Sequence, residues 1–133
     1  MEPIKVVLRY VDGRVLKGFT QNFYPNKERF HLFPADKSSD LATEVFIRDL
    51  KALFIVRDFI GDPSYDEQKN FSAGEKTFGR RVEVTFQDGE IIAGSTLGYD
   101  LKRNGFFIYP ADPKSNNIRA FIISFAIKRV RQI

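Results

Sequence analysis

A chain of 133 residues with 14 Phe, five Tyr and no Cys has the aromatic area for a small core but no disulfide bond or thiolate metal site. Its net charge of +4 permits a polyanionic partner without identifying one. No stretch approaches the roughly 18 apolar residues of a membrane-spanning helix, and the N-terminus lacks the basic start and apolar run of a signal peptide. We therefore expect a soluble cytoplasmic protein with no cofactor, no metal and no membrane contact.

One pattern occurs twice, at an offset of 76 residues. Its turn residues recur in pairs: Asp12 with Asp88, Gly13 with Gly89, Gly18 with Gly94, Pro34 with Pro110 and Asp36 with Asp112. Such a repeat indicates a duplicated structural unit. We predict a first small β-barrel at residues 1–58, a linker at 59–79 and a second barrel at 80–133. Because a chain of roughly 60 residues buries only about 60% of its unfolded surface, the copies should pack together.

The first copy contains five short segments with strand character. The apolar residues alternate in the first segment, which is typical of a strand with one buried face. Asp12-Gly13 then predicts a tight hairpin, and Gly18 inside the returning strand predicts a bulge or a sharp bend. The predicted strands are residues 4–10, 14–20, 30–33, 43–48 and 50–57.

Residues 58–79 have no counterpart in the repeat and are rich in Gly, Pro and Ser, as linkers are. Three aromatic residues, Tyr65, Phe71 and Phe78, nevertheless lie in this segment, and aromatic residues are scarce in random coil. We expect the linker to lie partly on a barrel surface, with one helical turn at residues 64–69.

The second copy repeats the order of the first, with predicted strands at residues 82–86, 90–96, 106–109, 121–124 and 126–133. Phe46 matches Phe121, 75 positions on, whereas Leu50 matches Ile127, 77 positions on, which predicts extra residues between the last two strands. The predicted fold is all-β: two tandem, five-stranded, strongly bent barrels joined by a linker. We expect them to pack about a pseudo-two-fold axis or to continue into a larger assembly.

The second copy carries a familiar spacing: Asp88-Gly89, then Gly94, Tyr99-Asp100 and Asn104. This spacing resembles the first signature of the Sm and Sm-like RNA-binding family, whose members are strongly bent five-stranded barrels. The resemblance implies that a loop Asp and Asn, with an Arg-Gly pair near the fourth strand, hold a nucleotide base. Asp100 and Asn104 match, but the Arg-Gly pair reads Ser124-Phe125 here and Arg48-Asp49 in the first copy. Neither copy holds a complete pocket.

The chain is also similar to an uncharacterised group of bacterial repeat domains, which are marked by Phe-Pro-Ala-Asp followed by Asn-Asn and Arg. The matching residues are Tyr109 to Asp112, Asn116-Asn117 and Arg119. Domains of that group occur beside signalling and regulatory modules. The resemblance therefore implies an accessory role and names no ligand.

Two groups of residues are candidates for binding single-stranded RNA, because aromatic faces stack on bases and nearby cations attract phosphates. The first group is the loop Tyr99, Asp100, Arg103 and Asn104 with Phe107, and the second is Arg48 with the basic C-terminal run Lys128, Arg129 and Arg131. The structural alternative places Tyr99 and Phe107 in the core and makes Asp100 a turn cap. The Pro-Ala-Asp loops are interpreted first as structural turns and second as a small-molecule site.

Catalysis has little support in the sequence. The lone His31 stands where the second copy has Phe107, and no Gly-rich phosphate loop or nucleophile elbow is present. We expect a non-catalytic bacterial regulatory or interaction module that acts through protein contacts, self-association included. Single-stranded RNA binding and small-molecule sensing remain the alternatives.

Overall fold

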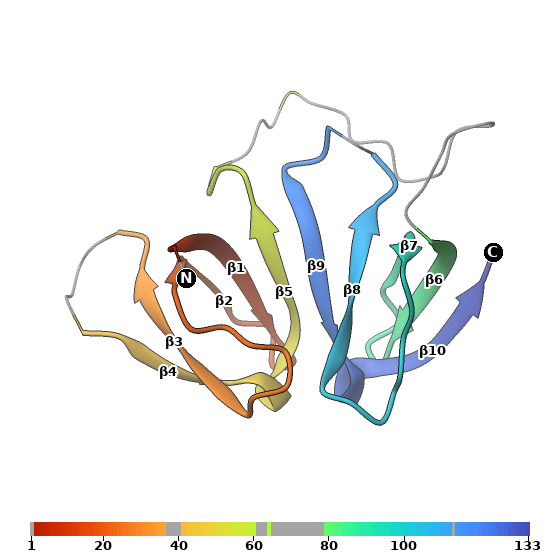
Figure 1. Ribbon diagram of the computed structural model, residues 1–133, viewed down its shortest axis with the longest axis horizontal. Coiled ribbons are helices and arrows are strands. Elements are labelled where there is room, and N and C mark those ends of the chain that lie inside the picture. Colours follow the sequence, from red (N-terminus) through yellow and green to blue (C-terminus); the bar gives the residue numbers. More distant parts are fainter. Residues whose placement is uncertain (1, 37–40, 61–63, 65–78, 113) are drawn as a thin grey trace.

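The computed structural model describes residues 2–36, 41–60, 64, 79–112 and 114–133 and has an all-β fold. Ten strands and two short 3-10 helices (η1 and η2) make up the regular structure of these residues (Figure 1). The first copy holds β1 (Ile4–Tyr10), β2 (Val15–Thr20), β3 (Arg29–Pro34), β4 (Thr43–Phe46), η1 (Ile47–Asp49) and β5 (Leu50–Val56). The second holds β6 (Arg80–Phe86), β7 (Ile91–Thr96), β8 (Gly105–Pro110), β9 (Asn117–Ile123), η2 (Ser124–Ala126) and β10 (Ile127–Gln132).

All ten strands belong to one antiparallel sheet with the order β10-β6-β7-β8-β9-β5-β1-β2-β3-β4. Within each copy the order is fifth, first, second, third and fourth strand. Among the described residues β4 does not pair with β5, and β9 does not pair with β10, so neither half closes on itself. The structure therefore shows one open sheet, and it does not confirm two closed five-stranded barrels.

The two copies join head to tail through β5 and β9, which lie side by side in the middle of the molecule (Figure 1). The register pairs Ala52 with Ile122, Leu53 with Phe121 and Phe54 with Ala120. The fifth strand of one copy thus meets the fourth strand of the other. A pseudo-two-fold axis between the copies would pair equivalent strands, so that expectation is wrong.

Each copy contributes side chains to the hydrophobic core of the other. Phe121 and Ile123 of β9 lie in the core of the first copy, whereas Ala52 of β5 lies in the core of the second. Successive side chains of a strand point to opposite faces of a sheet, so β5 and β9 are buried on both faces. This accounts for their continuous apolar sequences, LFIV in β5 and AFII in β9.

The extra residue of the second copy lies before β9, and not between its last two strands as the sequence alignment predicted. Strand β3 pairs Phe30 with Val45, and β8 pairs the equivalent Phe106 with Ile122. Val45 therefore matches Ile122, 77 positions on, which is also the offset between η1 and η2. Phe46, which ends β4 before η1 begins, accordingly does not match Phe121.

The hairpins form where Asp-Gly pairs predict them, and Gly13 and Gly89 adopt φ of 96° and 92°. Of the predicted bulge or sharp bend, no bulge is present at Gly18 or Gly94. They pair with Pro34 and Pro110 in regular ladders, and an added Cβ would collide with the backbone carbonyl of Phe33 or Tyr109. Glycine is required at these two positions because the next strand approaches too closely for a side chain.

Phe59, at the start of the linker, packs against the first copy. The ring of Phe59 packs edge-on against Phe19 at 5.2 Å, and Lys17 donates a 2.9 Å hydrogen bond to the Phe59 carbonyl. The helical turn expected at residues 64–69 lies outside the described residues, apart from Ser64. No helix in the described part of the chain is long and apolar enough to cross a membrane.

Candidate functional site

A groove of about 570 Å³ lies where a loop of the first copy meets the third and fourth strands of the second. One wall is Pro25-Asn26 in the β2–β3 loop. The other wall and the floor come from the β7–β8 loop, β8 and β9. The lining residues from the second copy are Thr96, Leu97, Gly98, Lys102 to Phe107, Tyr109, Arg119 and Phe121.

Asn104 holds the two walls together. Its side-chain amide nitrogen donates hydrogen bonds to the carbonyl oxygens of Pro25, at 3.1 Å, and Lys27, at 2.9 Å. These bonds join loops that lie nearly 80 residues apart in the sequence. The Asn104 amide nitrogen is thereby bonded within the protein, and Asn104 holds the two walls of the groove in place.

The charges on the groove are all of one sign. Lys102, Arg103 and Arg119 line it, and no carboxylate is among its lining residues in the described part of the chain. The Arg119 guanidinium lies 4.2 Å from the centre of the Phe107 ring, a cation–π contact that fixes its position. Outside the groove, an Asp100 oxygen lies 3.8 Å from the Nε of Arg103.

Aromatic rings form the floor. Phe107 packs edge-on against Phe121 at 5.1 Å, and Phe121 contacts Phe23 of the first copy at 5.3 Å. A second hollow of about 540 Å³ shares Pro25, Phe107 and Arg119 with the groove and adds Tyr24. Arg119 therefore stands between two adjoining depressions across the junction of the copies. The second hollow is lined by Glu2 as well, and Arg119 is the cation among its lining residues, so the basic character belongs to the first groove.

The four residues predicted in the β7–β8 loop have separate roles. Asp100 caps its own turn, because its Oδ1 accepts a 2.9 Å bond from the backbone N–H of Lys102. Tyr99, with 40% of its surface exposed, packs on Phe106 at 5.4 Å and does not line the groove. Of the four, only Arg103 and Asn104 line it.

The other predicted cations lie elsewhere. Arg48 stacks on Phe125, at 4.8 Å, where the two 3-10 helices meet. Lys128, Arg129 and Arg131 lie on β10, at the far end of the sheet order from β9 and β5, and contribute nothing to the groove. The structure therefore does not bring the C-terminal run to the loop that was predicted to act with it.

The predicted turn residues make turns. Asp12 and Asp88 each accept a 3.0 Å bond from the backbone N–H two positions on. Asp112 is buried and accepts a 2.8 Å bond from the N–H of Lys114. Pro34 and Pro110 end β3 and β8, and Asp36 lies two positions after the end of β3, in a turn. Asn116, the first residue of the Asn-Asn pair, also has a structural role. Its side-chain amide donates to the Asp58 carbonyl at 2.8 Å, and its side-chain oxygen accepts from the Asp58 N–H at 3.0 Å.

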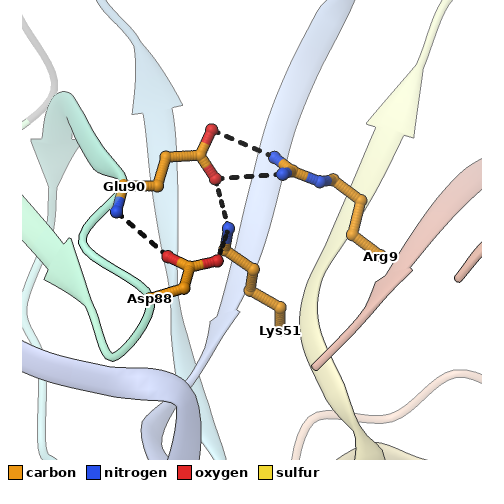
Figure 2. A network of polar contacts seen from close by, with 4 residues as sticks. All are labelled: Arg9, Lys51, Asp88 and Glu90. Atoms are coloured by element: carbon orange, nitrogen blue, oxygen red, sulfur yellow. Dashed lines mark hydrogen bonds and ion pairs between the residues drawn. The ribbon is translucent and has the colours of Figure 1, made fainter. Parts of the chain in front are cut away.

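A cluster of four charged side chains, here called the junction network, also links the two copies (Figure 2). It consists of Arg9 and Lys51 from the first copy and Asp88 and Glu90 from the second. Lys51 of β5 is nearly buried and binds Asp88, at 2.7 Å, and Glu90. Arg9 of β1 makes contacts of 3.0 Å and 3.4 Å to the two oxygens of Glu90. Two cations of the first copy thus hold two carboxylates of the second.

The junction network lowers the pKa of both carboxyl groups. For Asp88 the largest cause is the hydrogen bond from Lys51, followed by the bond from the Glu90 backbone N–H. Burial of Glu90 acts to raise its pKa, but hydrogen bonds and charge from Lys51 and Arg9 outweigh burial and the net shift is downward. Both carboxylates are therefore ionised at neutral pH and serve to join the copies.

No group of three or more His, Asp or Glu side chains that could hold a metal ion is found in the described part of the chain. The ring Nδ1 of His31 lies 3.0 Å from the amide nitrogen of Asn22, whose oxygen accepts a bond from the His31 backbone N–H. His31 is thus tied to its own copy.

Sequence reasoning missed two cations of the groove, Lys102 and Arg119, and the wall at Pro25. Arg119 did carry a signal, since it is a lone cation inside the apolar strand β9. The wall at Pro25 has no signal in the sequence, because only the pairing of β5 with β9 brings the β2–β3 loop to the second copy.

The chain belongs to a family of unknown function, DUF6982, whose model matches residues 2–133. Neither the curated proteins nor the solved structures gave a match.

Proposed function

We propose that this member of the family is a non-catalytic module that binds single-stranded RNA in the groove between its two copies. The observation that carries the proposal is the composition of the groove. Lys102, Arg103 and Arg119 line it without a carboxylate, over a floor of Phe107 and Phe121. Cations attract the phosphates of a single strand with little dependence on base sequence. The partly exposed ring of Phe107 is the aromatic surface that a base could contact, because Phe121 is 1% exposed.

The Sm-like interpretation of each copy is part of this proposal. A strand order of fifth, first, second, third and fourth is the order of a five-stranded barrel opened between its fourth and fifth strands. The mode of recognition differs from the one that the Sm signature implies. Asn104 and Asp100 serve the protein's own backbone, so Arg119 and the two loop cations are the residues that contact the RNA.

Fluorescence anisotropy with labelled single-stranded RNAs of about ten nucleotides and varied sequence tests the proposal. We expect saturable binding at about 150 mM KCl, weakened about tenfold or more by Lys102→Gln/Arg103→Gln and similarly by Arg119→Gln. Each lost phosphate contact should also flatten the plot of log affinity against log salt concentration.

Arg14→Gln/Arg29→Gln is the matched control, because it removes the same charge from exposed side chains that do not line the groove. RNA binding should survive in this control. Equal weakening in the control and the groove variants would show that RNA binding depends on net charge alone and not on the groove. Absence of binding at about 150 mM salt would refute the proposal.

A second proposed function is an interaction module that acts through protein contacts, as part of bacterial regulation. It is favoured by the outer strands β4 and β10, each of which has a partner on one side only among the described residues. Unpaired strand edges present backbone donors and acceptors to which another chain can add a strand. Small-molecule sensing by the Pro-Ala-Asp loops has no such support, because Asp112 is buried in its own turn.

A further inference from the structure

The molecule contains its own example of strand addition. The fifth strand of the first copy, β5, accepts the fourth strand of the second, β9. The fifth strand of the second copy is β10, and among the described residues it pairs only with β6. The outer edge of β10 is therefore the position that β9 fills in the first copy.

The outer edge of β10 presents a row of backbone groups. The N–H of Ile133 donates a 3.0 Å bond to the carbonyl of Arg81, so this residue faces β6. Residues of an antiparallel strand face alternate sides. The backbone N–H and C=O groups of Val130 and Gln132 consequently point away from β6, toward the open edge.

The side chains of β10 differ from those of β5 in charge. Ile127 matches Leu50, which places Arg129 at the position of Ala52 and Arg131 at the position of Phe54. Both arginines are exposed. Arg131 contacts Glu83 at 2.8 Å, whereas no carboxylate contact of Arg129 is seen among the described residues. Because they are two positions apart on a strand, the arginines lie on one face of the sheet.

A second copy of the chain does not complement these charges. In the internal junction Ala52 is opposite Ile122 and Phe54 is opposite Ala120. The first-copy equivalents of Ile122 and Ala120 are Val45 and Thr43. Repeating the junction between two molecules would thus set Val45 against Arg129 and Thr43 against Arg131, and Glu44 would lie on the opposite face. Charged edge strands of this kind oppose self-association.

We propose that the open edge of β10 binds an extended acidic segment of another protein, which adds to the sheet as a further strand. Carboxylates at alternate positions of that segment face Arg129 and Arg131, and its backbone bonds to Val130 and Gln132. Main-chain bonds supply affinity in this mode and the alternate side chains supply selectivity. The inference rests on the second proposed function and is independent of the RNA groove.

Anisotropy of a labelled nine-residue peptide that alternates Glu with Thr, titrated with the full chain at about 150 mM KCl, tests the proposal. We expect saturable binding, and at least about tenfold weaker binding by Arg129→Thr/Arg131→Thr. Gln132→Pro should weaken binding similarly, because it removes an outward-facing donor and no bond to β6. The control Arg14→Thr/Lys114→Thr removes two exposed cations elsewhere and should bind as the parent chain does.

The peptide provides a test that does not depend on the folding of variants. Methylation of the alternate backbone nitrogens that face β10 should abolish binding, while methylation of the other nitrogens should preserve it. Binding of a Lys-Thr peptide as tight as that of the Glu-Thr peptide, or binding that ignores backbone methylation, would overturn strand addition. Absence of peptide binding would overturn it as well.

Two further outcomes separate this inference from the other proposals. A mass that rises with protein concentration, and falls on mutation of β10, would overturn the acidic-segment proposal while supporting protein contacts in general. Loss of RNA binding in Arg129→Thr/Arg131→Thr with no peptide bound would assign the β10 edge to nucleic acid and overturn the proposal for a protein segment.

Discussion

Lys51, on β5 of the first copy, is the most buried member of the junction network and binds two carboxylates of the second copy. Its side chain is 7% exposed, whereas those of Asp88 and Glu90 are 59% and 37% exposed. Lys51 also lies 4.7 Å from the centre of the Phe86 ring. Ion pairs of exposed groups contribute little to stability in water, so the junction network matters mainly through the buried ammonium group.

The junction network predicts a loss of stability in acid. A carboxyl group with a lowered pKa in the folded state adds stability above its unfolded pKa, and this stability is lost as the pH falls through the folded pKa. The ordinary values are 3.8 for Asp88 and 4.5 for Glu90. The free energy of unfolding should therefore stay level from about pH 7 to about pH 5 and decline at lower pH.

Urea unfolding between about pH 7 and about pH 3 measures this dependence. Lys51→Met should decline less steeply than the parent chain, because Asp88 loses the main cause of its lowered pKa. Asp12, whose pKa is lowered chiefly by the backbone N–H of Arg14, is unchanged in both proteins and accounts for part of the remaining slope. Identical slopes for the two proteins would contradict the role given to Lys51.

At the scale of the element, β7 and β8 owe their close approach to a missing side chain. The two strands pair at Gly94 with Pro110 and at Ser95 with Tyr109. A Cβ on Gly94 would lie 2.5 Å from the Tyr109 carbonyl oxygen and would overlap the side chain of Ile108. The first copy has the same arrangement at Gly18, where a Cβ would collide with the carbonyl of Phe33, so the same packing requires glycine in both copies.

Gly94→Ala should lower the free energy of unfolding by about 1–3 kcal/mol, because the neighbouring strand must move to admit the methyl group. Gly98→Ala is the matched control. No atom lies within 4 Å of a Cβ built on Gly98, and its effect should stay within about 0.5 kcal/mol. Urea denaturation with comparison of the midpoints distinguishes them, and equal midpoints would show that β8 can shift without cost.

At the scale of the whole molecule, the two sequence copies share the strands at their junction between two hydrophobic cores. The core of the first copy contains Phe121 and Ile123 from the second, and the core of the second contains Ala52 from the first. The central strands β5 and β9 therefore belong to both cores. A separated copy would expose a strand edge and apolar side chains that the other copy covers.

We therefore expect one cooperative unfolding transition for the full chain. Phe121→Ala should lower the free energy of unfolding by about 3–5 kcal/mol while the transition remains single, since Phe121 is 1% exposed and packs between Phe23 and Phe107. Calorimetry with near-ultraviolet circular dichroism checks this result. A chain of residues 1–60 alone should show no cooperative transition, and two resolved transitions in the full chain would contradict a shared core.

The sequence by itself determined the all-β class, the recurrence of five strands in the same order, the two Asp-Gly hairpins and the position of most strands. These features depend on period-two alternation and turn chemistry, which act between near neighbours in the chain. The unbroken apolar runs of β5 and β9 are typical of strands that are buried on both faces. That pattern alone does not indicate which strand pairs with which.

Only the tertiary structure decided how the copies join and where the candidate site lies. The pairing of β5 with β9 brings Pro25 to the β7–β8 loop and sets Arg119 beside Phe107. It also occupies the amide of Asn104 and separates the basic strand β10 from the groove. These relations depend on contacts between residues far apart in the chain, and local propensity and spacing carry no information about such contacts.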